Sequence, residues 1–132
     1  MGAALTQYDK ELGNRIDQFS KRERYTQARM AEFMGVPIAR YKRFIYGEAK
    51  IPAENIAKLI EATPIDPDYL LFGREGGVMR LAEYLLGCSD KERADMHMEI
   101  ARAYRKRGLT NNVDYLVDGK TLVETEKKRK HK

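Results

Sequence analysis

The sequence predicts an all-α protein in which five short helices are followed by a further helical segment and a C-terminal β-hairpin. Apolar residues recur at three- and four-residue spacing through most of the chain, which is the periodicity of helices with one buried face. Glycine and proline interrupt this pattern repeatedly, so the helices are expected to be short. Only the last segment alternates apolar and polar residues as a strand does. A chain of 132 residues is sufficient for one domain with a sizeable core.

Five helices are expected within the first 73 residues, and they span residues 8–23, 27–34, 37–46, 53–62 and 67–72. Gly35 can adopt the left-handed conformation that ends a helix, and the ring of Pro37 suits the start of the next one. Pro64 ends the fourth helix because proline disfavours helix in the residue before it. Asp66 is an N-cap residue, with Pro67 in the first helical position of the fifth helix.

The second half continues with helices after a glycine-rich hinge at residues 74–77. An apolar face over residues 78–85 predicts one helix. Ser89 and Glu92 have the spacing of a capping box, which predicts a long helix over residues 90–107. The apolar stripe of that helix is weak, so it is better suited to packing on a partner than to forming a core alone.

A β-hairpin is expected near the C-terminus. Residues 113–117 and 120–124 read as two strands, and Asp118-Gly119 between them is the strongest type of two-residue hairpin turn. Because an isolated hairpin is marginally stable, it must pack on the helices, pair with a second chain or stay partly disordered. We favour pairing across a dimer.

The composition argues against an enzyme. Two histidines, two serines and one cysteine leave little material for a metal site or a nucleophilic triad, so no catalytic residue, metal or cofactor is expected. With no secretion signal, no long apolar run and no possible internal disulfide, we expect a soluble cytoplasmic protein without a membrane partner. Cys88 precedes a helix N-terminus, where a thiolate would be stabilised; the alternatives are a redox sensor and an ordinary thiol.

The positive charge is clustered, although the net charge is only +5. Such clusters suggest a polyanionic partner, and the alternatives are a solvated helix face or a solubilising tail. The clusters comprise Lys21, Arg22, Arg24 and Arg29, then Arg40, Lys42 and Arg43, and finally the basic tail at residues 127–132.

Two short helices joined by the turn at residues 35–37 form a helix-turn-helix. Tyr41 and Phe44 are expected to be buried, because the second helix of the pair needs an apolar face toward the core. From its outer side, side chains can reach base edges and phosphates in the major groove. Those outer residues are Ile38, Ala39, Arg40, Lys42, Arg43 and Tyr46.

Over residues 12–73 the sequence resembles the Cro and lambda-repressor type of helix-turn-helix regulators, also called the XRE family. The resemblance implies a five-helix, lambda-repressor-like DNA-binding domain. It further implies that Gln27 holds a phosphate and that Ile38, Ala39, Arg40 and Arg43 read bases. The stretches that match are Thr26-Gln27, residues 30–36, Gly47, Ile51-Pro52 and residues 66–73.

Individual contacts are expected to differ in kind. Arg40 and Arg43 each suit a two-pronged contact to guanine, with a phosphate contact as the alternative. Lys42 is expected at a phosphate or in solvent, and the Tyr46 hydroxyl at a phosphate unless it is merely exposed. Two further backbone contacts are expected from residues outside the recognition helix, Arg29 and Lys50.

The resulting hypothesis divides the chain into a DNA-binding domain at residues 1–73, a dimerisation segment at residues 74–126 and the basic tail. A homodimer with two recognition helices about 34 Å apart would read a palindromic operator on double-stranded DNA. The resemblance implies transcriptional regulation, more often repression, and the small size suggests a phage, prophage or mobile-element regulator.

Two alternatives remain open. One is an antitoxin whose C-terminal segment binds a protein partner. The other is an adaptor or antirepressor that grips a protein through an apolar surface of Ile38 and Ile45.

Overall fold

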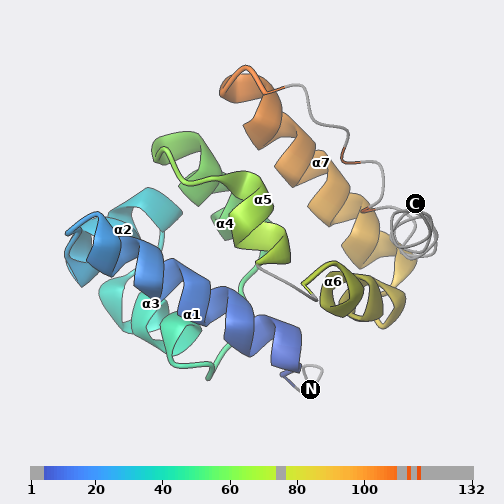
Figure 1. The fold of residues 1–132 in the computed structure, drawn as a ribbon, viewed down its shortest axis with the longest axis horizontal. Coiled ribbons are helices and arrows are strands. Elements are labelled where there is room, and N and C mark those ends of the chain that lie inside the picture. Colours follow the sequence, from blue (N-terminus) through green and yellow to red (C-terminus); the bar gives the residue numbers. More distant parts are fainter. Residues whose placement is uncertain (1–4, 74–76, 110–112, 114–115, 117–132) are drawn as a thin grey trace, which may run out of the picture.

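The computed structural model describes residues 5–73, 77–109, 113 and 116, and all secondary structure in this part of the chain is helical. Seven helices follow one another along it (Figure 1). They are α1 (Gln7–Arg22), α2 (Gln27–Met34), α3 (Ile38–Ile45), α4 (Ala53–Ala62), α5 (Pro67–Phe72), α6 (Gly77–Leu86) and α7 (Asp90–Lys106). The predicted helical fold is therefore confirmed for the described residues.

The local signals in the sequence place the helix ends correctly to within one or two residues. Gly35 is left-handed, with a φ of 72°, and ends α2. Asp66 caps α5 with Pro67 in its first turn, and the capping box of Ser89 and Glu92 starts α7. Pro37 differs slightly from expectation, because it is the N-cap of α3 rather than its first residue. The prediction also missed a capping box that starts α1, made by Thr6 and Asp9.

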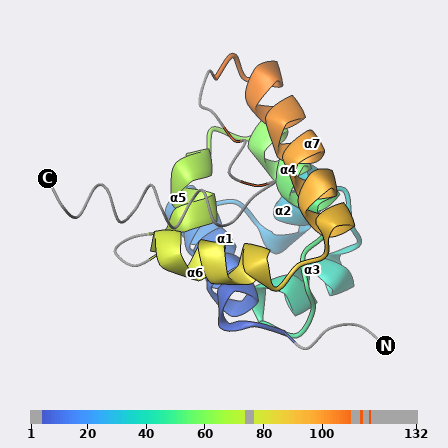
Figure 2. The same ribbon diagram turned by 90° about the vertical axis from the view of Figure 1, so that its right-hand side faces the viewer.

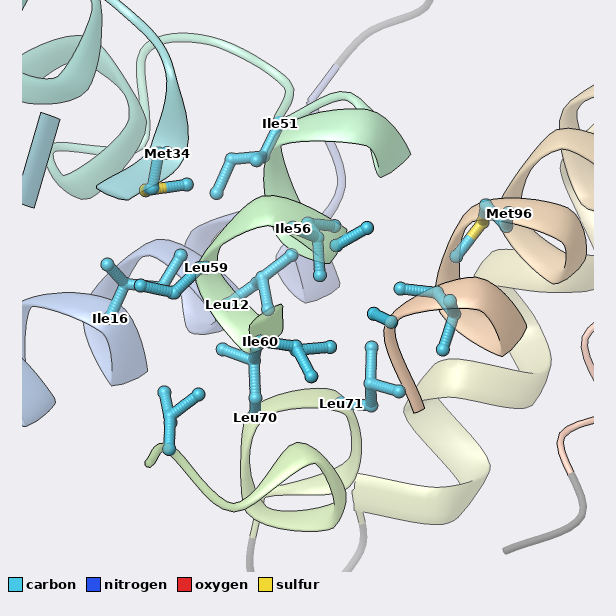
Figure 3. Close-up of a cluster of buried hydrophobic side chains, with 14 of the residues drawn as sticks. Leu12, Ile16, Met34, Ile51, Ile56, Leu59, Ile60, Leu70, Leu71 and Met96 are labelled. Atoms are coloured by element: carbon cyan, nitrogen blue, oxygen red, sulfur yellow. The ribbon is translucent and has the colours of Figure 1, made fainter. Parts of the chain in front are cut away.

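α6 and α7 share one core with the first five helices. α7 packs along α4, and α6 lies against α1 and α5, as Figures 1 and 2 show. Leu81 and Leu85 of α6 and Ile100 of α7 are fully buried in the same cluster as the apolar residues of α1, α4 and α5. Figure 3 shows Met96 of α7 facing this cluster. The weak stripe of α7 thus finds its partner within its own chain.

Three arginines tie helices together by donating to backbone carbonyl groups at or beyond helix ends. Arg15 Nε donates to the carbonyl oxygen of Leu70 at 2.9 Å, near the end of α5. Arg93 donates to Leu85 and Cys88 at the end of α6, and Arg107 donates to Ile65 after α4. The last of these bonds fixes the end of α7 to the loop between α4 and α5.

The predicted C-terminal hairpin finds no support. Within its first strand only Val113 and Leu116 are described; both are buried, and the Leu116 amide donates to the Val113 carbonyl at 3.0 Å. A bond between residues three apart belongs to a turn, not to an extended strand. The other residues of the predicted hairpin, the basic tail at 127–132 and most of the predicted hinge lie outside the described residues.

Cys88 lies at the junction of α6 and α7, where it is buried. Burial raises the pKa of its thiol, an effect that outweighs the favourable charge of Lys50 nearby. This is the opposite of the stabilised thiolate that a redox sensor requires.

We therefore expect Cys88 to react with iodoacetamide at least about tenfold more slowly in the folded protein than in urea, because the thiolate is the reacting species. The reaction is followed by mass spectrometry at one pH in both solutions. Equal rates would contradict the buried position of this thiol.

Candidate nucleic-acid interface

Two hydrogen bonds hold the turn between α2 and α3 in one geometry, and a third caps the start of α2. The Thr26 hydroxyl accepts from the Arg29 amide at 3.0 Å and so caps the start of α2. At the other end, the Val36 amide donates to the Ala31 carbonyl at 3.0 Å. Asn55 of α4 is buried, and its side-chain amide donates to the Met34 carbonyl at 2.8 Å. These bonds fix the direction in which α3 leaves the turn.

One face of α3 is anchored in the core and the other is open. Tyr41, Phe44 and Ile45 are buried, as the structure of a helix-turn-helix requires. The open face carries the six residues that the sequence predicts there, and it is exposed throughout: Ile38, Ala39, Arg40, Lys42, Arg43 and Tyr46. The structure thus brings all six onto one continuous surface.

The burial of Ile45 corrects one prediction. The adaptor hypothesis required an apolar surface made by Ile38 and Ile45. Ile45 is only 8% exposed and belongs to the core, whereas Ile38 is 42% exposed. The large apolar side chains of the open face are therefore Ile38 at one end of α3 and Tyr46 just beyond the other.

α3 is seated very closely on α1. A Cβ built at Gly13 of α1 would lie 2.2 Å from the carbonyl oxygen of Phe44, closer than real atoms approach. Only glycine allows this contact. The backbone of α1 therefore sets the depth at which α3 lies, and hence how far its open face stands out.

The open face of α3 is positively charged. It carries Arg40, Lys42 and Arg43 and no acidic residue. Among the described residues, neither Lys42 nor Arg43 is paired with a carboxylate, so both charges are available to a ligand. The guanidinium carbon of Arg40 lies 5.7 Å from the centre of the Phe44 ring, one turn further along α3.

The three predicted contacts outside α3 differ in availability. Gln27 lies half-buried in the first turn of α2, where backbone amides favour an anion. Arg29 is exposed, but it donates to Glu32 at 2.8 Å and lies 4.8 Å from the centre of the Phe33 ring. Its charge is thus partly neutralised within α2.

Lys50 is not joined to the α3 face. Its ammonium group lies 3.4 Å from a carboxylate oxygen of Glu92 in α7 and 4.7 Å from the centre of the Tyr84 ring in α6. The side chain thus reaches toward the C-terminal helices.

Sequence reasoning missed one basic residue beside the interface. Lys10 of α1 is exposed and packs against the turn after α3, where its Cγ would be 3.1 Å from a Cβ built at Gly47. It also missed Asn55, which holds the turn. No local signal marks either residue, because each acts on a segment far away in the sequence.

The arrangement defines a helix-turn-helix whose second helix, α3, has an exposed cationic face. The profile of a helix-turn-helix family matches residues 20–70. This part of the chain is therefore a helix-turn-helix domain of the Cro and lambda-repressor type, the XRE family. A domain of this type places the protein among DNA-binding transcriptional regulators. No curated protein and no solved structure matches the chain.

In the part of the chain that the structure describes, every helix is too short or too polar to cross a membrane.

Proposed function

We propose that the protein is a repressor that binds a palindromic operator as a homodimer and reads it with the open face of α3. The observation that carries this proposal is the surface of α3 itself. Three cations lie on a helix that contains no acidic residue and whose other side is fixed in the core by Tyr41 and Phe44. A rigid, cationic, exposed helix fits the negative major groove of DNA.

The side chains on this face suit different parts of the duplex. Arg40 and Arg43 are one turn apart at most and can each donate two bonds to a guanine edge. Lys42 and the Tyr46 hydroxyl suit flanking phosphates, as do Gln27 and Arg29 from α2. Two smaller residues complete the face: Ala39, which permits close approach of the helix, and Ile38, which suits a thymine methyl group.

The homodimer is proposed because one short helix covers only a few base pairs. Two copies that bind adjacent half-sites on one face of the duplex supply the specificity that a genome requires. We assign DNA binding to residues 1–73, dimerisation to residues 74–126 and additional phosphate affinity to the tail. Occupation of a promoter by such a dimer represses transcription.

The first experiment is selection of bound sequences from a random DNA pool, followed by fluorescence anisotropy with the selected duplex and a scrambled one. We expect a palindrome that is preferred by about a thousandfold or more. Sedimentation velocity should give a mass of two chains per duplex. Equal binding to both duplexes would overturn the proposal, because it would show phosphate contacts alone.

Arg43→Ala tests the assignment of α3. We expect it to weaken binding of the selected duplex by about 1–3 kcal/mol per half-site and to relax the preference at one position in each half-site. Arg105→Ala is the matched control. Arg105 is exposed on α7, so this substitution removes the same positive charge at a site away from α3. Equal effects of the two changes would mean that Arg43 contributes only its charge.

Truncation after Gly73 is a poor test of dimerisation for this protein. It would uncover the core residues of α1, α4 and α5 that α6 and α7 bury. Loss of binding by the truncated chain would then reflect unfolding as much as loss of the second copy. Sedimentation of the full chain over a range of concentrations avoids this difficulty.

A further inference from the structure

Among the described residues, Lys50 is the only predicted DNA-contacting residue whose side chain forms an ion pair with α6 or α7. Lys50 follows α3 by a few residues. Its ammonium group lies 3.4 Å from a carboxylate oxygen of Glu92, a residue 42 positions further along the chain. The same ammonium group lies 4.7 Å from the centre of the Tyr84 ring. Lys50, Tyr84 and Glu92 all line one pocket, which α1, α4, α6 and α7 surround.

Glu92 is a strong partner for a lysine at neutral pH. It is the capping-box residue of α7, and its carboxylate accepts from the Ser89 amide at 3.2 Å. Hydrogen bonds from Ser89, with a smaller effect of Lys50, hold the pKa of Glu92 below its ordinary value. The carboxylate is therefore ionised and fixed in position by its own helix before Lys50 reaches it.

The pair is nevertheless weak enough to exchange. The side chains of Lys50 and Glu92 are 37% and 51% exposed. Water screens a pair of this kind, so its free energy is small and a DNA phosphate can compete for the lysine. A phosphate that takes Lys50 must first separate it from Glu92 and from the Tyr84 ring.

We propose that Glu92 limits the DNA affinity of the protein by holding Lys50 away from the DNA backbone. This inference rests on the proposed use of the α3 face for DNA. Glu92 is then a positioning residue, which acts on DNA only through Lys50. Any shift of α7 that separates the pair would supply one more phosphate contact, so the C-terminal segment sets the affinity of the N-terminal domain.

The test is a double-mutant cycle measured by anisotropy with the selected duplex. Glu92→Gln keeps the capping box, because glutamine serves equally in that position, but removes the charge that holds Lys50. We expect it to tighten binding about two- to fivefold at low salt, the range that an exposed ion pair supplies. The gain should shrink as salt rises from about 0.05 to 0.2 M, because the new contact is to a phosphate.

Two further variants separate this mechanism from simple loss of negative charge. Asp95→Asn is the matched control, because Asp95 lines the same pocket one turn along α7 but pairs with Lys91. It should change affinity far less than Glu92→Gln does. Lys50→Met in the Glu92→Gln chain should remove the gain, so the effect of Lys50→Met should be larger in that chain than in the native one.

The outcomes distinguish the inference from the proposed function. A gain from Glu92→Gln that persists with Lys50→Met, or that Asp95→Asn reproduces, would overturn the inference, because the effect would then be general repulsion. An unchanged affinity of Glu92→Gln would overturn it as well. A native protein that does not distinguish the selected duplex from a scramble would instead overturn the proposed function.

Discussion

Gly13→Ala should destabilise the protein by about 2–3 kcal/mol, although alanine is the better helix former. The added Cβ would lie 2.2 Å from the Phe44 carbonyl oxygen, and a backbone atom cannot rotate out of the way as a side chain can. α1 and α3 must move apart, so Tyr41 and Phe44 lose part of their packing. We expect the urea midpoint, followed by circular dichroism, to fall clearly, and DNA affinity to fall with it because α3 is displaced.

Asn14→Ala is the control for this change. Asn14 is the next residue of α1 and is exposed, so alanine there gains helix propensity without a steric conflict. It should leave stability unchanged or raise it by a few tenths of a kcal/mol. A stabilised Gly13→Ala variant would show that α1 and α3 are not in close contact in solution.

Ile100→Ala should have an effect of similar or larger size, about 2–5 kcal/mol, because it leaves a cavity between α4 and α7. Ile100 is fully buried, and α7 packs along α4 rather than standing apart from the DNA-binding helices. Since the core is shared, we expect the Ile100→Ala variant to unfold in a single transition. Its midpoint should be lowered by the same amount whether the probe lies in the first or the second half of the chain.

Met98→Ala provides the comparison on the same helix. Met98 is 59% exposed, so its replacement should change stability by no more than about 0.5 kcal/mol in the monomer. If Ile100→Ala produced a second, earlier transition while the rest of the protein unfolded as before, the two halves would be independent units. The shared core described above would then be wrong.

Most of the fold is predictable because its signals are local. Gly35 ends α2 by its own conformation, and Asp66 with Pro67 starts α5 whatever lies around it. Local signals do not show which helix packs against each apolar face. The stripe of α7 reads as weak because part of its packing comes from Tyr104, which is buried beside Ile100 and lies close to Asp68 of α5. The placement of α6 and α7 on the first five helices depends on such long-range contacts.

The same distinction applies to the interface. The outer face of α3 follows from helical periodicity together with the need to bury Tyr41 and Phe44, so its six residues are found from sequence. Ile45 is the exception, since the close contact with α1 buries a position at the edge of that face. The pairing of Lys50 could not be predicted, because Glu92 belongs to another helix and is recognisable only as a cap.

α4 has consequences for any attempt to graft this DNA-binding unit onto another protein. On one side of α4, Asn55 holds the turn between α2 and α3. On the other side, the Glu61 carboxylate lies 3.6 Å from Arg102 and 3.5 Å from Lys106 of α7. A transplanted unit that stopped before α6 would keep the bond from Asn55 to the turn. It would lose the contacts with α7 and so expose Glu61. A chimera therefore needs a redesigned outer surface on α4, or must carry α7 along, and natural recombination between α5 and α6 would meet the same constraint.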